Sequence, residues 1–185
     1  MEIVPTDLPD VKVITPKKFG DHRGFFSEVF RKDAFAAAGI DCGFVQDNHS
    51  LSASAGVVRG LHWQVGKTAQ HKLVRVLRGA ILDVAVDIRR RAPTFGKHVA
   101  VELSADNWRQ MFVPIGFAHG FVTLAPDTEV VYKVSTYYAP ADERGVRWND
   151  PALGINWGLR EAEATLSDRD RQHPLFADLP GDWLF

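Results

Sequence analysis

One histidine stands inside a strongly apolar stretch of the chain. In GVVRGLHWQ, residues 56–64, His62 lies among valine, leucine and tryptophan, with Arg59 nearby. Alternation along a strand would put His62 on the same face as Val58 and Gly60, with Arg59 on the other face. A titratable ring in this setting is either a hydrogen-bonded core side chain or a base or metal ligand in a lined cavity. A lone histidine favours the core, so the other polar residues must decide.

More polar side chains interrupt apolar segments further along. Asp83 and Asp87 alternate with valines in DVAVDI, Lys72 opens KLVRV, and Tyr132 lies within VVYKV. A hairpin around VGKT would bring His62 and Lys72 close together across a ladder. Because a buried charge is costly unless it is paired, several such groups in one barrel indicate a polar cavity rather than a dry core.

The elements that must position these side chains are mostly strands. Short apolar runs separated by turn-like segments predict strands at 11–16, 24–30, 57–64, 71–77, 80–88, 98–104, 109–114, 120–124 and 128–138. A helix is predicted over 31–40, with Asp33 as its N-cap and Gly39 as its stop, and a second near Asp168–His173. The proline-rich C-terminal third is expected to wrap the strands. This pattern is typical of an all-β sandwich or barrel with a few short helices.

Bulk composition narrows the function classes. The 185 residues are expected to form one domain, 1–185, large enough for a core without disulfides. A net charge of -1 gives no sign of nucleic-acid binding. Cys42 is the single cysteine, which excludes a disulfide framework and favours a reducing, cytoplasmic setting. The N-terminus has no secretory pattern, and no apolar run approaches the ~18 residues of a membrane span.

Two segments resemble the paired motifs of the cupin barrel, a jelly-roll double-stranded β-helix. The first runs from Gly56 to Gly79 and keeps His62, but it has Gln64 at the second histidine position and no glutamate. The second, VPIGFAHGF, keeps only His119. Two separated histidines without a carboxylate make a poor first-row metal site, so no metal is expected. No nucleotide-cofactor fingerprint is present, so no other cofactor is expected either.

This combination of retained and missing cupin residues resembles that of the dTDP-4-dehydrorhamnose 3,5-epimerase family, whose members are metal-free cupin-like enzymes of bacterial sugar-nucleotide metabolism. The resemblance runs from about Val11 to Trp157 and resumes at LSDRD. It rests on the ordered motifs FGDHRGFFSE, FVQDNHS, VRGLHWQ, AQHKLVRVLRGAILDVAVDIR, APTFG, PIGFAHGFVTL and YKVSTYY. The resemblance therefore implies a cupin-like fold and an epimerase activity.

The resemblance also implies roles for single residues. The expected catalytic residues are His62 as base, Tyr132 as acid, Asp170 as partner of the base and Lys72 beside the developing oxyanion. The substrate, a 4-keto-6-deoxyhexose on dTDP, is expected to contact Arg23, Glu28, Gln46, Asn48, Arg59, His119, Tyr138, Glu143 and Arg169. The thymine is expected to stack on Phe26, with Phe19 nearby. At position 169 the family often has lysine, and arginine keeps the charge but changes the geometry.

The family implies a homodimer, in which the strand VKVITP would extend a partner's sheet. The expected reaction is loss of the protons at C3 and C5, each next to the C4 carbonyl, and their return from the opposite face.

Other functions stay open at this point. A mono-epimerase acting at C3 or C5 alone would share the base and the barrel, and the presence of Tyr132 favours the double epimerase. A non-catalytic cupin sugar-nucleotide binder would not need His62, Tyr132 and Asp170 together. A metal-dependent cupin dioxygenase is opposed by Gln64 and the missing glutamate, and a 3,4-ketoisomerase fits the motifs less well.

Overall fold

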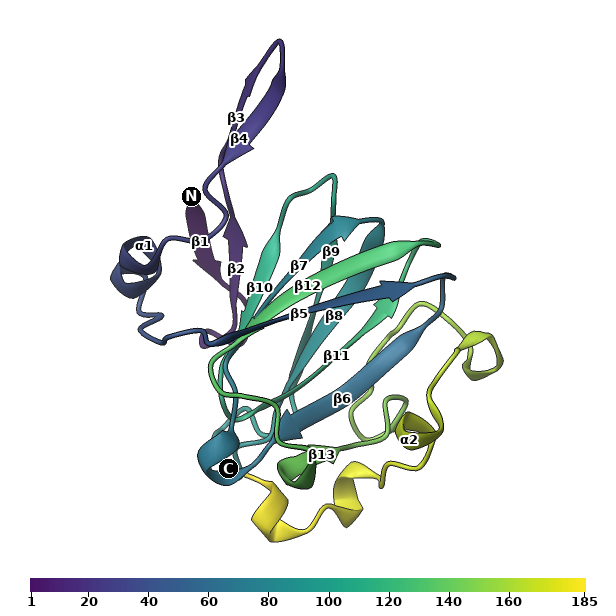
Figure 1. Cartoon of the computed structure of the whole chain (residues 1–185). Coiled ribbons are helices and arrows are strands. Elements are labelled where there is room, and N and C mark those ends of the chain that lie inside the picture. Colours follow the sequence, from purple (N-terminus) through teal and green to yellow (C-terminus); the bar gives the residue numbers. More distant parts are fainter.

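Two antiparallel β-sheets face each other in the computed structural model, which describes all residues, 1–185 (Figure 1). The larger sheet has the strand order β1 (Glu2–Pro5), β2 (Lys12–Thr15), β10 (Gln110–Val113), β7 (Lys72–Arg78), β12 (Thr128–Val134) and β5 (Gln46–Ser52). The smaller sheet has the order β13 (Glu143–Gly145), β6 (Val58–Gln64), β11 (Phe117–Thr123), β8 (Ala80–Asp87) and β9 (His98–Ser104). The predicted all-β architecture with few short helices is confirmed.

The core lies between the two sheets. Buried side chains from both inner faces meet there, including Val74 and Met111 of the larger sheet and Ile81, Leu103 and Phe117 of the smaller. These positions alternate with residues that point away from the core, and on β11 both sets are buried because the smaller sheet is covered on both faces.

The C-terminal segment covers the outer face of the smaller sheet, as the sequence predicted (Figure 1). Trp148, Leu153 and Trp157 pack there against Leu61 and Val86. The segment contains the short helix α2 (Asp168–Arg171) and the 3₁₀ turns Glu161–Glu163, Phe176–Asp178 and Gly181–Trp183. Further 3₁₀ turns lie at Gly66–Thr68 and Pro140–Asp142. This segment therefore carries Asp170 to the rim of the smaller sheet.

The first helix differs from its prediction at the N-terminus. Helix α1 spans Lys32–Ala37, and Arg31 occupies the N-cap position that was assigned to Asp33. Asp33 lies in the first turn instead, where its carboxylate pairs with Arg31 and faces the positive end of the helix dipole. Gly39, with φ of 77°, ends the helix as predicted. No helix in the structure combines the length and hydropathy needed to span a bilayer.

The N-terminal strands also depart from expectation. The segment VKVITP is not a free edge, because β2 pairs with β1 on one side and with β10 on the other. The strand predicted over 24–30 is shorter, since β4 (Gly24–Ser27) pairs with β3 (Lys18–Asp21) and ends at Ser27. This β3–β4 hairpin projects away from both sheets, at the opposite end of the molecule from β13 and α2 (Figure 1).

Candidate active site

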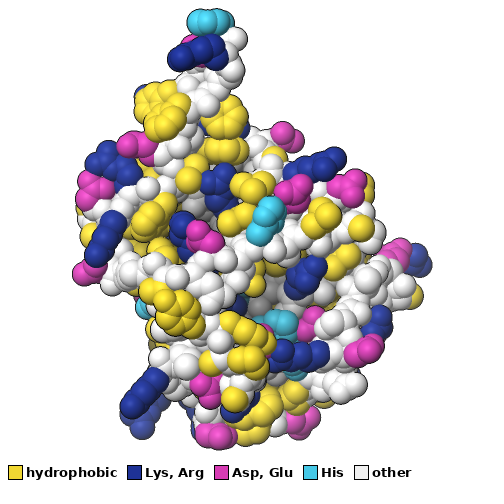
Figure 2. Space-filling view, in the orientation of Figure 1, with side chains coloured by type: hydrophobic (Ala, Val, Ile, Leu, Met, Phe, Trp, Pro, Cys, Tyr) yellow, Lys and Arg dark blue, Asp and Glu magenta, His cyan; other side chains and the backbone are white.

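A polar cavity of about 410 Å³ opens between the two sheets. Only 4 of its 17 lining residues are hydrophobic, in agreement with the polar cavity predicted from the sequence. The lining residues are Gln46, Asn48, Ser50, Arg59, His62, Trp63, Gln64, Gln70, Lys72, His119, Phe121, Tyr132, Tyr138, Glu143, Ser167, Arg169 and Asp170. In Figure 2 the hollow on this face has cyan histidine and dark-blue cationic side chains at its mouth. Residues distant in sequence are thus brought to one chamber.

Strict strand alternation fails in β6 at this cavity. His62 and Arg59 both line it, although alternation would put them on opposite faces. The β6–β11 pairing changes register between His119 and Phe121, where two steps along β11 match three steps along β6. The extra residue on β6 forms a β-bulge, which turns the side chains on either side of it to the same face. Gly60 lies at this irregularity with φ of 109°, and a Cβ there would stand 2.6 Å from the His119 carbonyl oxygen. The close approach of the two strands therefore requires glycine.

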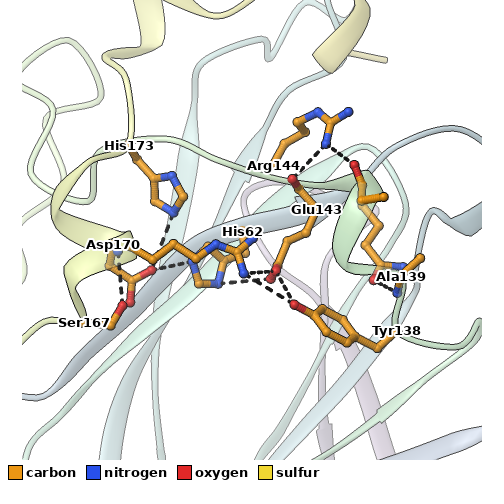
Figure 3. A network of polar contacts seen from close by, with 11 residues as sticks. His62, Tyr138, Ala139, Glu143, Arg144, Ser167, Asp170 and His173 are labelled. Carbon is orange, nitrogen blue, oxygen red and sulfur yellow. Dashed lines mark hydrogen bonds and ion pairs between the residues drawn. The ribbon is translucent and has the colours of Figure 1, made fainter.

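His62 lies between two carboxylates (Figure 3). Its Nε2 is 2.5 Å from Oδ1 of Asp170, and its Nδ1 is 3.8 Å from Oε1 of Glu143. Its side chain is 23% exposed, so it is a cavity residue and not a core histidine. An ionised Asp170 accepts the Nε2–H of His62, and the neutral ring then presents the lone pair of Nδ1 to the cavity. Nδ1 is therefore the atom positioned to take a proton.

Asp170 is held as a carboxylate by its surroundings. Burial by itself raises the pKa of Asp170, but hydrogen bonding to His173 and His62 outweighs that effect and holds the pKa well below its usual range. Ser167 caps helix α2 by accepting a hydrogen bond from the Asp170 N–H at 3.1 Å. The cap fixes the start of the helix, and with it the direction of the Asp170 side chain.

Lys72 and Tyr132 line the cavity from strands β7 and β12 of the larger sheet. Burial lowers the pKa of Lys72 to about 8, although the negative charges of Glu143 and Asp83 act in the other direction. Burial likewise raises the pKa of Tyr132, so its phenol keeps its proton at neutral pH. An ammonium and a phenolic proton donor therefore stand across the cavity from the base.

The hairpin predicted between the His62 and Lys72 strands is wrong. β6 pairs with β11 and β13, whereas β7 pairs with β10 and β12, so the two strands belong to different sheets. The connection between them crosses from one sheet to the other, as jelly-roll connections do. The two side chains share a chamber because the sheets face each other.

Five further expected residues line the rim. Arg169 forms an ion pair with Glu143, and the Tyr138 hydroxyl donates to Glu143 at 2.6 Å. On β5, the Gln46 amide donates to the Asn48 side-chain oxygen at 2.8 Å. The ion pair joins the C-terminal segment to β13, and the Tyr138 N–H, which donates to the Gln46 side-chain oxygen at 3.1 Å, links β5 to the same opening.

His119 has a buried carboxylate behind it. Its Nε2 is 2.7 Å from Oδ1 of Asp83, which is fully buried, and the other Asp83 oxygen has no hydrogen-bond partner. His119 lies directly opposite His62 in the β6–β11 pairing. Asp83, one of the polar residues that suggested a cavity, therefore supports a cavity histidine without lining the cavity itself.

Four expected substrate contacts do not line this cavity: Arg23, Glu28, Phe19 and Phe26. All lie on or beside the projecting β3–β4 hairpin (Figure 1). Arg23 pairs with Asp21 and its side chain is 78% exposed, and Phe26 is 67% exposed.

Sequence reasoning missed several residues at the site. The following line the cavity without having been proposed to contact substrate: Ser50, Trp63, Gln64, Gln70, Phe121 and Ser167. All of them lie within the motifs that carry the family resemblance, but their side chains are of ordinary polar or aromatic types, so only the fold shows that they line the cavity.

One cluster has the residue types of a metal site: His62, Asp170 and His173. Two ligands of one tetrahedral zinc ion stand about 3.4 Å apart, because each bond is about 2.0–2.2 Å long. The 2.5 Å between His62 and Asp170 is much shorter and is a hydrogen-bond distance. The arrangement fits a base with its orienting partner better than a metal-binding site.

Comparison with known proteins identifies the family. The family model described as dTDP-4-dehydrorhamnose 3,5-epimerase matches residues 5–178. The chain belongs to this family. A Sinorhizobium fredii protein of that name is 53% identical over 173 residues, which cover 94% of this chain and 88% of the relative.

Solved structures agree with this assignment. The Legionella pneumophila dTDP-6-deoxy-D-glucose-3,5-epimerase, in complex with dTDP-4-keto-L-rhamnose, is 44% identical with a TM-score of 0.94 over 99% of this chain and 96% of that chain. A 3'-monoepimerase from Streptomyces bikiniensis, in complex with dTDP-quinovose, is 36% identical with a TM-score of 0.87 over 94% and 87%. The family resemblance and the cupin-like fold expected from it are confirmed.

Proposed function

We propose that His62, Asp170, Lys72 and Tyr132 carry out the reaction of this family, the 3,5-epimerisation of dTDP-4-dehydro-6-deoxy-D-glucose to dTDP-4-dehydro-L-rhamnose. The observation that carries the proposal is the orientation of His62. Its Nε2 is bonded to a buried carboxylate, and its free Nδ1 faces a polar cavity.

His62 acts as the base. The hydrogens at C3 and C5 are acidic because each carbon neighbours the C4 carbonyl, and Nδ1 removes one of them to leave an enolate. The imidazolium that forms is stabilised by Asp170 at Nε2 and by Glu143 near Nδ1. A neutral imidazole suits this step, because one ring nitrogen can take a proton while the other donates to a carboxylate.

Lys72 and Tyr132 complete the reaction from the other wall. The Lys72 ammonium stabilises the charge that develops on O4, where a fixed charge in a cavity is more effective than water. Tyr132 donates its proton to the opposite face of the carbanion, which inverts the carbon. Base and acid must stand on opposite sides for inversion, and the two sheets provide that separation.

The remaining cavity residues bind the nucleotide sugar. Arg59 and Arg169 suit the pyrophosphate, since a guanidinium can bind phosphate oxygens bidentately. Gln46, Asn48, His119, Tyr138 and Glu143 provide hydrogen-bonding groups around the opening.

The chain is proposed to be a single domain that works as a cytoplasmic homodimer. The β3–β4 hairpin points away from the cavity of its own chain, yet it carries Arg23, Phe19 and Phe26, with Glu28 beside it. In a dimer this hairpin would reach the cavity of the second copy, where these residues would contact the nucleotide. Aromatic side chains this exposed also favour burial against another surface.

The test is deuterium incorporation. The protein is incubated with dTDP-4-keto-6-deoxy-D-glucose in D2O, and deuterium at C3 and C5 is followed by NMR, with and without a 4-reductase and NADPH. Deuterium at both carbons and an L-rhamno product after reduction are expected. Deuterium at one carbon only would make the protein a mono-epimerase. No exchange at either carbon would refute the proposal for this substrate.

His62→Ala serves as the matched variant in the same assay. It is expected to abolish exchange while dTDP still binds, because His62 is proposed to move protons and not to hold the nucleotide. Retained turnover would remove His62 as the base.

A further inference from the structure

A second histidine contacts the catalytic carboxylate. His173 follows helix α2, and its Nε2 is 3.5 Å from the same Oδ1 of Asp170 that bonds His62 (Figure 3). Its side chain is 10% exposed, and its buried Nε2 has no hydrogen-bond partner of ordinary geometry. The rings of His173 and His62 pack edge to face, with centroids 5.2 Å apart and planes at 78°. Nothing in the proposed proton transfers uses His173.

The backbone around His173 is shaped to admit its ring. Gly145 lies on β13 opposite His62, and a Cβ at position 145 would stand 2.4 Å from Cε1 and Nε2 of His173. Such a distance is far below van der Waals contact, so any other residue at 145 would displace the ring. The Arg147 N–H donates to the Pro174 carbonyl at 2.9 Å, which fixes the chain beside His173. The ring therefore sits in a slot that the β13 backbone leaves open.

We propose that His173 is a positioning residue for the catalytic pair, donating its Nε2–H to Oδ1 of Asp170 and supporting the ring of His62 with its edge. A buried N–H is costly when it has no acceptor, and Asp170 is the only carboxylate within ion-pair distance of it. With two donors on one oxygen, the carboxylate cannot rotate freely, and Oδ1 stays directed at Nε2 of His62. His62 then remains the tautomer that presents Nδ1 to the cavity. The inference rests on the proposed role of His62 as base.

Two substitutions at position 173 separate the hydrogen bond to Asp170 from the ring contact with His62. His173→Phe keeps a ring against His62 and removes the donor, whereas His173→Gln keeps an amide donor near the place of Nε2. The loss of one hydrogen bond to a charged group predicts a kcat about tenfold lower for His173→Phe. KM and the affinity for dTDP should stay within about twofold, because His173 does not line the cavity. His173→Gln should recover most of the lost rate.

A spectroscopic measurement reports the same effect without substrate. Long-range ¹H–¹⁵N spectra of protein labelled at its 7 histidines distinguish the two imidazole tautomers. The His62 signals, assigned by their absence in His62→Ala, should show the Nε2–H form in the wild type and a mixture in His173→Phe. Gly145→Ala should resemble His173→Phe, because it displaces the ring without changing it.

The outcomes are distinct. Unchanged kcat and an unchanged His62 tautomer in His173→Phe would overturn the inference. Equal losses in the Phe and Gln variants would also overturn it, because the donor would then not matter. If His173→Phe fails to fold, Gly145→Ala takes its place. A lower kcat and a mixture of His62 tautomers in Gly145→Ala, with neither in His173→Gln, would support the inference, and no change in Gly145→Ala would overturn it. A wild-type protein that shows no exchange would refute the proposed function instead, whereas the tautomer spectra would still test His173.

Discussion

The pH dependence of the reaction should be controlled by Lys72 on its alkaline side. The Lys72 pKa of about 8 follows from burial between the sheets, opposed by Glu143 and Asp83. The protonated amine stabilises the enolate, so activity is present below this pKa and is lost as the pH rises through it. About nine-tenths of the lysine is protonated at pH 7 and about one-tenth at pH 9, so kcat/KM should fall roughly tenfold between these values.

The titration of Tyr132 should not obscure the titration of Lys72. Burial raises the pKa of Tyr132 above its ordinary value, so the proposed acid keeps its proton across the range from pH 7 to 9. The assay is the initial rate of deuterium incorporation at low substrate concentration, read by NMR, which needs no coupling enzyme. Under these conditions the profile reports groups of the free enzyme.

Two variants at position 72 test the assignment. Lys72→Arg retains a cation that does not titrate in this range, so its profile should be flat from pH 7 to 9, at a lower overall rate. Lys72→Met should be slow at every pH, with kcat reduced more than substrate affinity. A wild-type profile that stays level to pH 9, or an alkaline fall that persists in Lys72→Arg, would refute the role given to Lys72.

Three further predictions address the acid, the partner of the base and the bulge. Tyr132→Phe should still exchange hydrogen into solvent but invert about 10²–10⁴-fold more slowly, and normal inversion would assign the acid elsewhere. Asp170→Asn should lower kcat about 10²–10⁴-fold with dTDP affinity preserved, measured by steady-state kinetics and calorimetry; a change below about tenfold would contradict its pairing with His62. Gly60→Ala should lose about 2 kcal/mol or more and lower Tm by about 4–8 °C, since its φ is positive and its Cβ would meet backbone. Gly43→Ala, with open space around it, is the matched control in the thermal melts, and equal Tm values would contradict the packing argument.

Residue types and local patterns determined much of this protein in advance. Apolar alternation is a local property of the backbone, so most strands and the all-β class could be read from the chain. The ordered motifs identified the family, and they carried His62, Lys72, Tyr132 and Asp170 as candidates before any of them was placed in space. The absence of a second histidine at Gln64 similarly argued against a metal-binding cupin from the sequence alone.

Other features depended on contacts between distant segments. The bulge that turns Arg59 and His62 to one side arises from pairing with β11, and no local period encodes a change of register. Lys72 faces His62 across two sheets and not within one ladder, because jelly-roll connections cross between sheets.

The tertiary structure alone also decided which ring nitrogen is free. Asp170 lies 108 residues from His62 in sequence, and its hydrogen bond to Nε2 directs Nδ1 to the cavity. The slot for His173 depends in the same way on the absence of a side chain at Gly145, a constraint that exists only once β13 and the C-terminal segment are packed together. Sequence thus specified which groups were available for chemistry. Long-range packing determined their distances, their ionisation and their direction, because those properties arise from neighbours that the linear chain does not place together.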